Sequence, residues 1–155
     1  MATSRPNLFE RTMVLAVSGN HEELEQLQRL FTESSWMLQA LGTLAEAKRW
    51  LGQNPAPVVL CASQLPDGDW KDMLQVTAQI DPSPNLVVAS RLADNRLWAE
   101  VLNLGGYDVL PLPTNAAEMF RTLSGAWRNW KARSDVEAIG LSPPELDRTA
   151  LTGPR

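Results

Sequence analysis

The chain has 155 residues, of which 44% are hydrophobic and 21% charged, and its formal net charge is -4. This length and composition favour one globular domain with a substantial core. The negative charge argues against nucleic acid or an anionic membrane as the main binding partner. Cys61 is the only cysteine, which excludes an internal disulfide and a thiolate-rich metal site.

Residues 1–12 are largely polar and are interpreted as an N-terminal extension. They lack the apolar stretch of a signal peptide, and no later segment has the apolar length of a membrane span. We therefore expect a cytoplasmic protein.

Short apolar runs alternate with helical patterns in the first half of the chain. Strands are predicted over 13–17, 36–41 and 58–62. The segment 21–34 has leucines at helical spacing and early glutamates, and the turn at Ser18–Asn20 supplies a cap signal before it. Thr43 is the predicted cap of a second helix that ends near Gly52.

The second half repeats this alternation. Helices are predicted over 70–80 and 93–104, and strands over 86–89 and from Val109 onward. Asn115 is the expected cap of a last helix with a long apolar stripe. On the helix over 93–104, we expect Leu97, Val101 and Leu104 to face inward.

Five short apolar strands separated by helices predict an α/β fold of the flavodoxin-like type. Its five-stranded parallel sheet is doubly wound and lies between two helical layers. Sites in such sheets form where strand order reverses, at the ends of the first and third strands. Ser18, Gly19 and Ala62 should meet there.

Four stretches stand in a particular order and at particular separations: VLAVSGNHEE, VLCASQLPDGDW, VVASR and LNLGGYDVLPLPTN. Together they resemble the receiver domains of two-component response regulators, over residues 13–133. The resemblance implies a signalling module of a phosphorelay, and a cis peptide bond before Pro113.

Transferred residue by residue, the family's site is lost in this chain. The phosphoacceptor falls on Ala62, four residues before Pro66. The paired metal-binding acids fall on Ser18 and Gly19, the hydroxyl residue on Ser90, the switch aromatic on Val109 and the lysine on Leu112. Magnesium needs carboxylate oxygens and phosphoryl transfer needs a nucleophile, so the resemblance implies a degenerate pseudo-receiver with no metal, cofactor or catalytic residue.

Loss of acids and lysine together fits a fold kept after its chemistry was abandoned. A buried lysine left without its acids would be costly, whereas replacing a whole ionic cluster by neutral groups can be neutral or stabilising. The chain is therefore expected to act by binding another signalling protein or a second copy.

Several single residues have both a functional and a structural interpretation. His21 could be an acid–base group or an exposed helix residue. Asp67 and Asp69 could hold a cation or bond the backbone of their own turn. Cys61 lies within an apolar strand, where inert packing is expected. The turn at Ser18–Asn20 could meet a phosphate at a helix N-terminus.

Trp98 does not fit the predicted inward line of its helix. It is a candidate interface residue with Leu97, Val109 and Trp130, on the face that serves receivers for output and dimerisation, or else a locally buried ring. Residues 134–155 contain three prolines and are interpreted as a flexible tail.

Two alternatives to a phosphorylation-incompetent binding module remain. One is a response regulator component activated by a small ligand or by constitutive dimerisation. The other is a small flavodoxin-like domain, possibly an enzyme, that binds a phosphate-bearing ligand or cofactor at the loop after the first strand.

Overall fold

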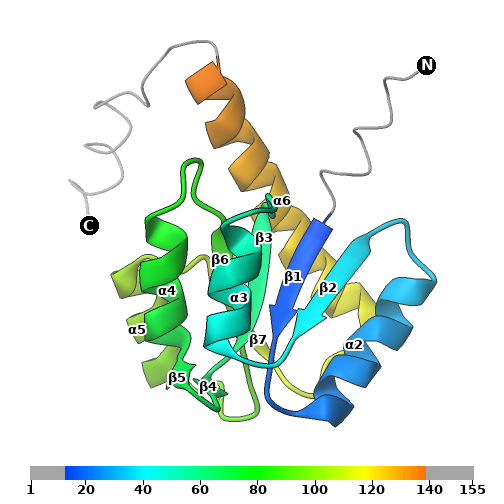
Figure 1. Cartoon of the computed structure of the whole chain (residues 1–155). Coiled ribbons are helices and arrows are strands. Elements are labelled where there is room, and N and C mark those ends of the chain that lie inside the picture. Colours follow the sequence, from blue (N-terminus) through cyan, green and yellow to red (C-terminus); the bar gives the residue numbers. More distant parts are fainter. Residues whose placement is uncertain (1–12, 139–155) are drawn as a thin grey trace.

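The computed structural model describes residues 13–138, which form a central parallel sheet with helices on both faces (Figure 1). The strands follow the order β2-β1-β3-β6-β7. Their bounds are β1 Met13–Val17, β2 Met37–Leu41, β3 Val58–Ala62, β6 Asn85–Ser90 and β7 Asp108–Pro111. The chain leaves β1 for one side of the sheet and returns past it to β3, so the reversal of strand order lies between β1 and β3.

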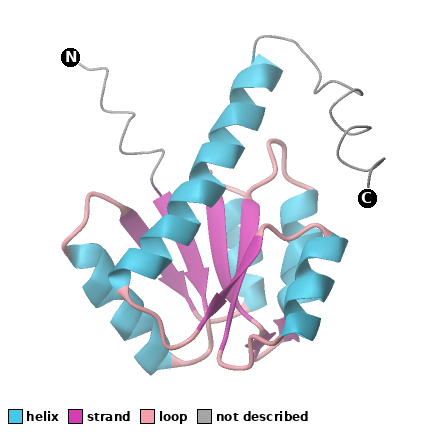
Figure 2. Cartoon of the chain, turned by 180° about the vertical axis from the view of Figure 1, so that it is seen from behind, coloured by secondary structure: helices cyan, strands magenta, loops and turns pink. Residues whose placement is uncertain are grey.

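Among the described residues, three helices cover one face of the sheet and two cover the other. The opposite views of Figures 1 and 2 show helices on both faces. The first layer contains α3 (Leu44–Leu51), α4 (Trp70–Ala78) and α5 (Asn95–Leu104), and the second contains α2 (His21–Thr32) and α6 (Ala116–Ala138). This arrangement confirms the predicted doubly wound, three-layer α/β fold.

The core consists of two apolar clusters, one on each face of the sheet. Along β1, Leu15 and Val17 belong to the cluster under α3, α4 and α5, whereas Val14 belongs to the cluster under α2 and α6. Successive strand residues point to opposite faces, which explains why the buried strands are apolar throughout.

Polar side chains cap the helices where the sequence predicted them. The side chains of Asn20, Thr43 and Asn115 each accept a hydrogen bond from the backbone N–H three residues later, at the starts of α2, α3 and α6. Asp94 does the same for α5, which begins two residues later than the predicted helix.

The prediction that Leu104 faces inward on α5 was wrong. Leu104 is 53% exposed, whereas Trp98 packs with Leu97 against the buried Val101. The indole Nε1 of Trp98 donates to Asp108 Oδ1 at 3.0 Å. Because this bond satisfies the polar end of the ring, Trp98 can lie partly inside the fold.

The last helix runs five residues beyond the expected domain end at residue 133. Arg133 Nη2 donates to Ser83 O at 3.0 Å and to Asn85 Oδ1 at 2.9 Å, and its Nε donates to Asn129 Oδ1. These bonds fasten α6 to the start of β6. The remainder of the expected tail, and the N-terminal extension, lie outside the described residues.

Two further details complete the backbone. The Leu112–Pro113 bond is cis, as predicted, and Asp81–Pro82 is cis as well. Among the described residues, no helix is long and apolar enough to cross a membrane.

Candidate functional site

The predicted site residues lie along one edge of the sheet, where the strands end. The register pairs Val17 with Cys61, and Ala62 with Ala89, which brings the ends of β1, β3 and β6 side by side. Leu112, which follows β7, lies next to these strand ends because its backbone N–H donates to Ser90 O at 2.9 Å. Ser18, Gly19, Ala62, Ser90 and Leu112 therefore share this edge.

Pro66 lies against Gly19. It belongs to a hairpin of two-residue strands, β4 (Gln64–Leu65) and β5 (Gly68–Asp69), where the sequence had indicated only a turn. A Cβ built on Gly19 would lie 2.8 Å from Pro66 Cγ and 3.0 Å from Pro66 Cδ. A side chain at position 19 therefore needs Pro66 to move, and no acidic group has room there without that shift.

Hydroxyl groups, and no carboxylates, come from the ends of β3 and β6. Ser63, the residue after Ala62, donates from its Oγ to Ser90 Oγ at 3.4 Å, and the backbone N–H of Leu92 donates to the same Ser90 oxygen at 3.0 Å. The methyl group of Ala62 offers no nucleophile. These contacts shape the segment that leaves β6.

A chain of polar contacts crosses the end of β1. Ser18 Oγ accepts from Asn20 N at 3.0 Å and donates to Glu23 Oε1 at 3.2 Å. The other oxygen of this carboxylate, Oε2, lies 3.4 Å from Arg91 Nε. The Glu23 side chain is only 18% exposed, so water screens this ion pair less than a pair on the open surface.

Leu112 lies beside this network, where it lines a small cavity together with Glu23 and Arg91. It packs against the core cluster that contains Leu60 and Ala89. A cavity of about 30 Å³ remains between Glu23, Arg91, Leu112 and their neighbours on α2. Such a volume holds a water molecule but no phosphoryl group or substrate.

The aspartates of the hairpin bond backbone at helix starts. Asp67 Oδ1 and Oδ2 accept from Leu44 N at 2.7 Å and Ala45 N at 3.0 Å, and these donors hold the pKa of Asp67 below its ordinary value. Asp67 was expected to bond the backbone of its own turn, but its carboxylate binds mainly the first backbone N–H groups of α3. Asp69 caps α4 and forms a capping box with Asp72. No group of three or more His, Cys, Asp or Glu residues in the described part of the chain could hold a metal.

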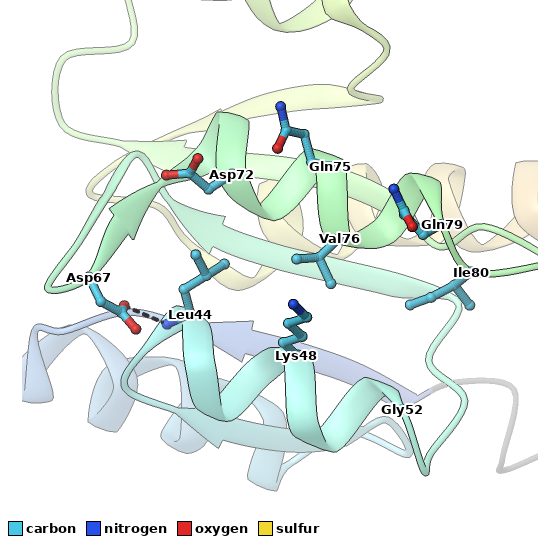
Figure 3. A pocket seen from close by; sticks show the side chains of 9 residues that line it. All are labelled: Leu44, Lys48, Gly52, Asp67, Asp72, Gln75, Val76, Gln79 and Ile80. Atoms are coloured by element: carbon cyan, nitrogen blue, oxygen red, sulfur yellow. Dashed lines mark hydrogen bonds between the residues drawn. The ribbon is translucent and has the colours of Figure 1, made fainter.

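A larger open cleft of about 650 Å³ lies between α3 and α4 (Figure 3). Apolar side chains from Leu44, Val76 and Ile80 line it, and Lys48 points across it from α3 toward Val76. The two carboxylates at its end, Asp67 and Asp72, already bind backbone N–H groups at helix starts. The cleft is large enough for a ligand but offers no free acid.

Cys61 and His21 have the structural roles that their positions indicated. Burial raises the pKa of the Cys61 thiol from 9.0 to about 12, with a smaller contribution from the Asp69 carboxylate, so the thiol is unreactive near neutral pH. His21 is the exposed first residue of α2.

The candidate interface residues do not form one exposed patch. Val109 is only 2% exposed and lies in the core, where Leu97 and Trp98 pack against its cluster. Trp130 lines a different cleft with Pro55 and Pro84, near the amino ends of the strands. Val109 therefore cannot contribute to a surface, and Trp98 is partly buried, which favours the alternative of a locally buried ring.

Three residues of this region were not predicted from the sequence: Glu23, Ser63 and Arg91. Pro66 was used only to place Ala62, and its contact with Gly19 was not expected. Glu23 and Arg91 had a visible signal, because opposite charges follow closely after β1 and β6, whose carboxyl ends lie at the same edge of the sheet on either side of β3. The contact of Pro66 with Gly19 had none, since it depends on the path of the hairpin.

Solved receiver domains share this fold. The signal receiver domain of an HD domain-containing protein from Pseudomonas fluorescens Pf-5 is similar with a TM-score of 0.71 and 24% identity, over 79% of this chain and 98% of that one. The receiver domain of a putative Luxo repressor protein from Vibrio parahaemolyticus matches with a TM-score of 0.75 and 19% identity, over 82% and 98%. The beryllofluoride-activated NtrC4 receiver domain dimer matches with a TM-score of 0.71 and 19% identity, over 77% and 98%.

No protein-family model matches the chain, and comparison with curated proteins finds no match. At these identities the likeness establishes the fold, which is that of response regulator receiver domains.

Proposed function

We propose that this chain is a receiver-like signalling module that does not accept a phosphoryl group and acts by binding another protein or a second copy of itself. The observation that carries the proposal is the contact between Pro66 and Gly19 beside Ala62. An alanine stands at the acceptor position, and a proline ring occupies the space that an acidic side chain at position 19 would need.

The neutral strand ends support the same conclusion. Ser18, Ala62 and Leu112 supply a hydroxyl, a methyl and an isobutyl group, which gives Mg²⁺ no carboxylate and a phosphoryl group no cation. The one charged pair of this edge, Glu23 with Arg91, is internally neutralised. The edge is therefore a structural element, and the working surface lies elsewhere.

An exposed part of α5 supports binding on the face proposed for output. Ala99, Leu102 and Asn103 are exposed and lie on one side of the helix. Leu102 is 51% exposed and lies one turn beyond Trp98, whose indole bonds Asp108 of β7. This α5 surface, defined by Ala99, Leu102 and Asn103, thus borders the edge strand and replaces the set first expected.

The proposal is tested by chemical phosphorylation. Incubation with acetyl phosphate and Mg²⁺ should add no acid-labile phosphate and leave the melting temperature unchanged, because the edge offers no acceptor. A phosphorylatable receiver domain assayed in parallel shows that the reagent is active. One stoichiometric phosphoryl group at this edge would overturn the proposal.

The enzyme-class alternative requires a ligand at the loop after β1. Pro66 lies against Gly19 in that loop, and the Asn20 side chain already binds the Glu23 N–H of α2. These contacts disfavour a phosphate site there. A thermal-shift screen with nucleotides and flavins tests this alternative, and a pull-down from the native lysate separates partner binding from a ligand-activated regulator.

A further inference from the structure

We infer that the ion pair between Glu23 and Arg91 is a latch that holds the segment 91–94, between β6 and α5, in one position without any phosphoryl group. The latch joins three parts of the chain: the end of β1 through Ser18, the first turns of α2 through Glu23, and the first residue after β6 through Arg91. The inference concerns the conformation of this segment and stands whether or not α5 binds a partner.

Glu23 is well placed to act as the fixed half of the latch. Its carboxylate is mostly shielded from solvent, and Ser18 Oγ holds one of its oxygens at 3.2 Å. Its position on α2 is set by the Asn20 cap, which binds the Glu23 N–H. The carboxylate therefore loses little freedom when Arg91 binds, and an ion pair with a pre-positioned group costs less side-chain entropy than one between two mobile side chains.

Arg91 is the movable half. Its side chain is 59% exposed, and its only ion pair in the described part of the chain is with Glu23. The next residue, Leu92, is 81% exposed, so burial of apolar surface does not anchor it. Apart from the latch, the segment is held by two polar bonds, from Leu92 N to Ser90 Oγ and from Asp94 N to Leu92 O, and by Ala93, which packs against the core cluster under α3, α4 and α5.

The latch acts on the start of α5 because the segment is short. Asp94 is the N-cap of α5 and accepts from Leu97 N at 2.9 Å. Release of Arg91 would leave Arg91 and Leu92, between Ser90 and Ala93, held to β6 only by the bond from Leu92 N to Ser90 Oγ. Fixing Arg91 to α2 thus sets where α5 begins relative to the sheet.

Amide hydrogen exchange of the full chain tests the latch. Glu23→Gln and Arg91→Gln each remove the ion pair, the first with an isosteric side chain and the second with a shorter polar one. Both should speed exchange of the amides in 91–95 by about three- to tenfold, because local opening no longer breaks an ion pair. The amides of β3 report global unfolding and should exchange at the wild-type rate.

Two kinds of control make the result specific. Glu22→Gln and Arg96→Gln alter exposed charges on the same helices that form no ion pair in the described part of the chain, and should leave exchange unchanged. The charge-reversed chain with Glu23→Arg and Arg91→Glu should restore slow exchange at 91–95.

Wild-type exchange at 91–95 in both single variants would overturn the latch. Equal acceleration at 91–95 and in β3 would also overturn it, because the pair would then stabilise the whole fold and not this segment. Failure of the charge-reversed chain to slow exchange would show that the pairing itself is not responsible.

Discussion

The contact between Gly19 and Pro66 leaves no room for a side chain at position 19, at the edge of the sheet where the strands end. Gly19 is required because Pro66 leaves no room for a Cβ, whereas a Cβ on Gly42 would meet nothing closer than 3.8 Å. The two glycines follow the ends of neighbouring parallel strands, β1 and β2. A side chain at position 19 should displace Pro66 of the hairpin, whereas a side chain at position 42 should not.

Gly19→Ala should therefore lower the free energy of unfolding by about 1–3 kcal/mol, the usual cost of forcing extra atoms into a packed site. Gly42→Ala is the matched control and should change it by less than about 0.5 kcal/mol. Urea unfolding of both variants measures the difference. The cost of Gly19→Ala should shrink in a Pro66→Ala background, and an unchanged cost there would contradict the contact as its cause.

The buried thiol of Cys61 predicts a loss of stability in alkaline solution. Its pKa is raised to about 12 in the folded chain, so between about pH 9 and 12 the unfolded chain loses this proton while the folded chain keeps it. The folded state binds more protons there, and stability falls with rising pH by up to about 1.4 kcal/mol per unit from this group. Below pH 9 the group makes no difference.

The Cys61→Ala variant isolates this effect from other groups that titrate in the same range. Its absolute stability should be lower because a buried side chain is truncated, but its stability should fall less steeply above pH 9 than that of the wild type. Guanidinium unfolding at a series of pH values gives both slopes. Parallel slopes would show that the thiol ionises as readily in the folded chain as in the unfolded one.

At the level of elements, the sequence predicted every strand of the main sheet and every helix between residues 13 and 138 to within a few residues. The signals were local: apolar runs, caps such as Thr43 and Asn115, and the stop at Gly52. The site edge followed from these signals, because parallel strands place their carboxyl ends together.

The errors arose where a long-range contact overrides the local pattern. The rotation of α5 depends on Asp108, which lies on β7 and accepts the indole N–H of Trp98. The hairpin of β4 and β5 has only two residues in each strand, too few for a period-two pattern. The extension of α6 depends on Arg133 reaching Ser83 and Asn85, about fifty residues earlier.

This last contact predicts the behaviour of the end of α6. Arg133→Ala removes the hydrogen bonds to Ser83, Asn85 and Asn129, so the last turns of the helix should exchange their amide hydrogens faster while the core strands remain protected. Arg128→Ala, an exposed position on the same helix, is the control. Equal exchange in the two variants would show that helix propensity alone holds these turns.

At the scale of the whole molecule, the proposed function requires a binding face away from the carboxyl ends of the strands. Leu102 and Leu104 are almost equally exposed, at 51% and 53%, but lie about 200° apart around α5. Leu102 lies one turn beyond Trp98, whose indole bonds Asp108 of β7, and Leu104 lines a cleft with Leu74 and Thr77 of α4. They offer a matched pair of apolar side chains on opposite flanks of one helix.

We expect a second copy of the chain to bind the α5 surface, so that Leu102→Glu raises the dissociation constant of the dimer at least about thirtyfold and Leu104→Glu leaves it nearly unchanged. Sedimentation over a concentration series measures both. Neither substitution should change the free energy of unfolding by more than about 0.5 kcal/mol, since both side chains face water. Trp98→Ala, in contrast, should cost about 3 kcal/mol through lost packing and loss of the indole bond to Asp108, because its ring belongs to the fold. Equal weakening by Leu102→Glu and Leu104→Glu would assign association to another face, and a wild-type chain that stays monomeric would exclude a second copy as the partner.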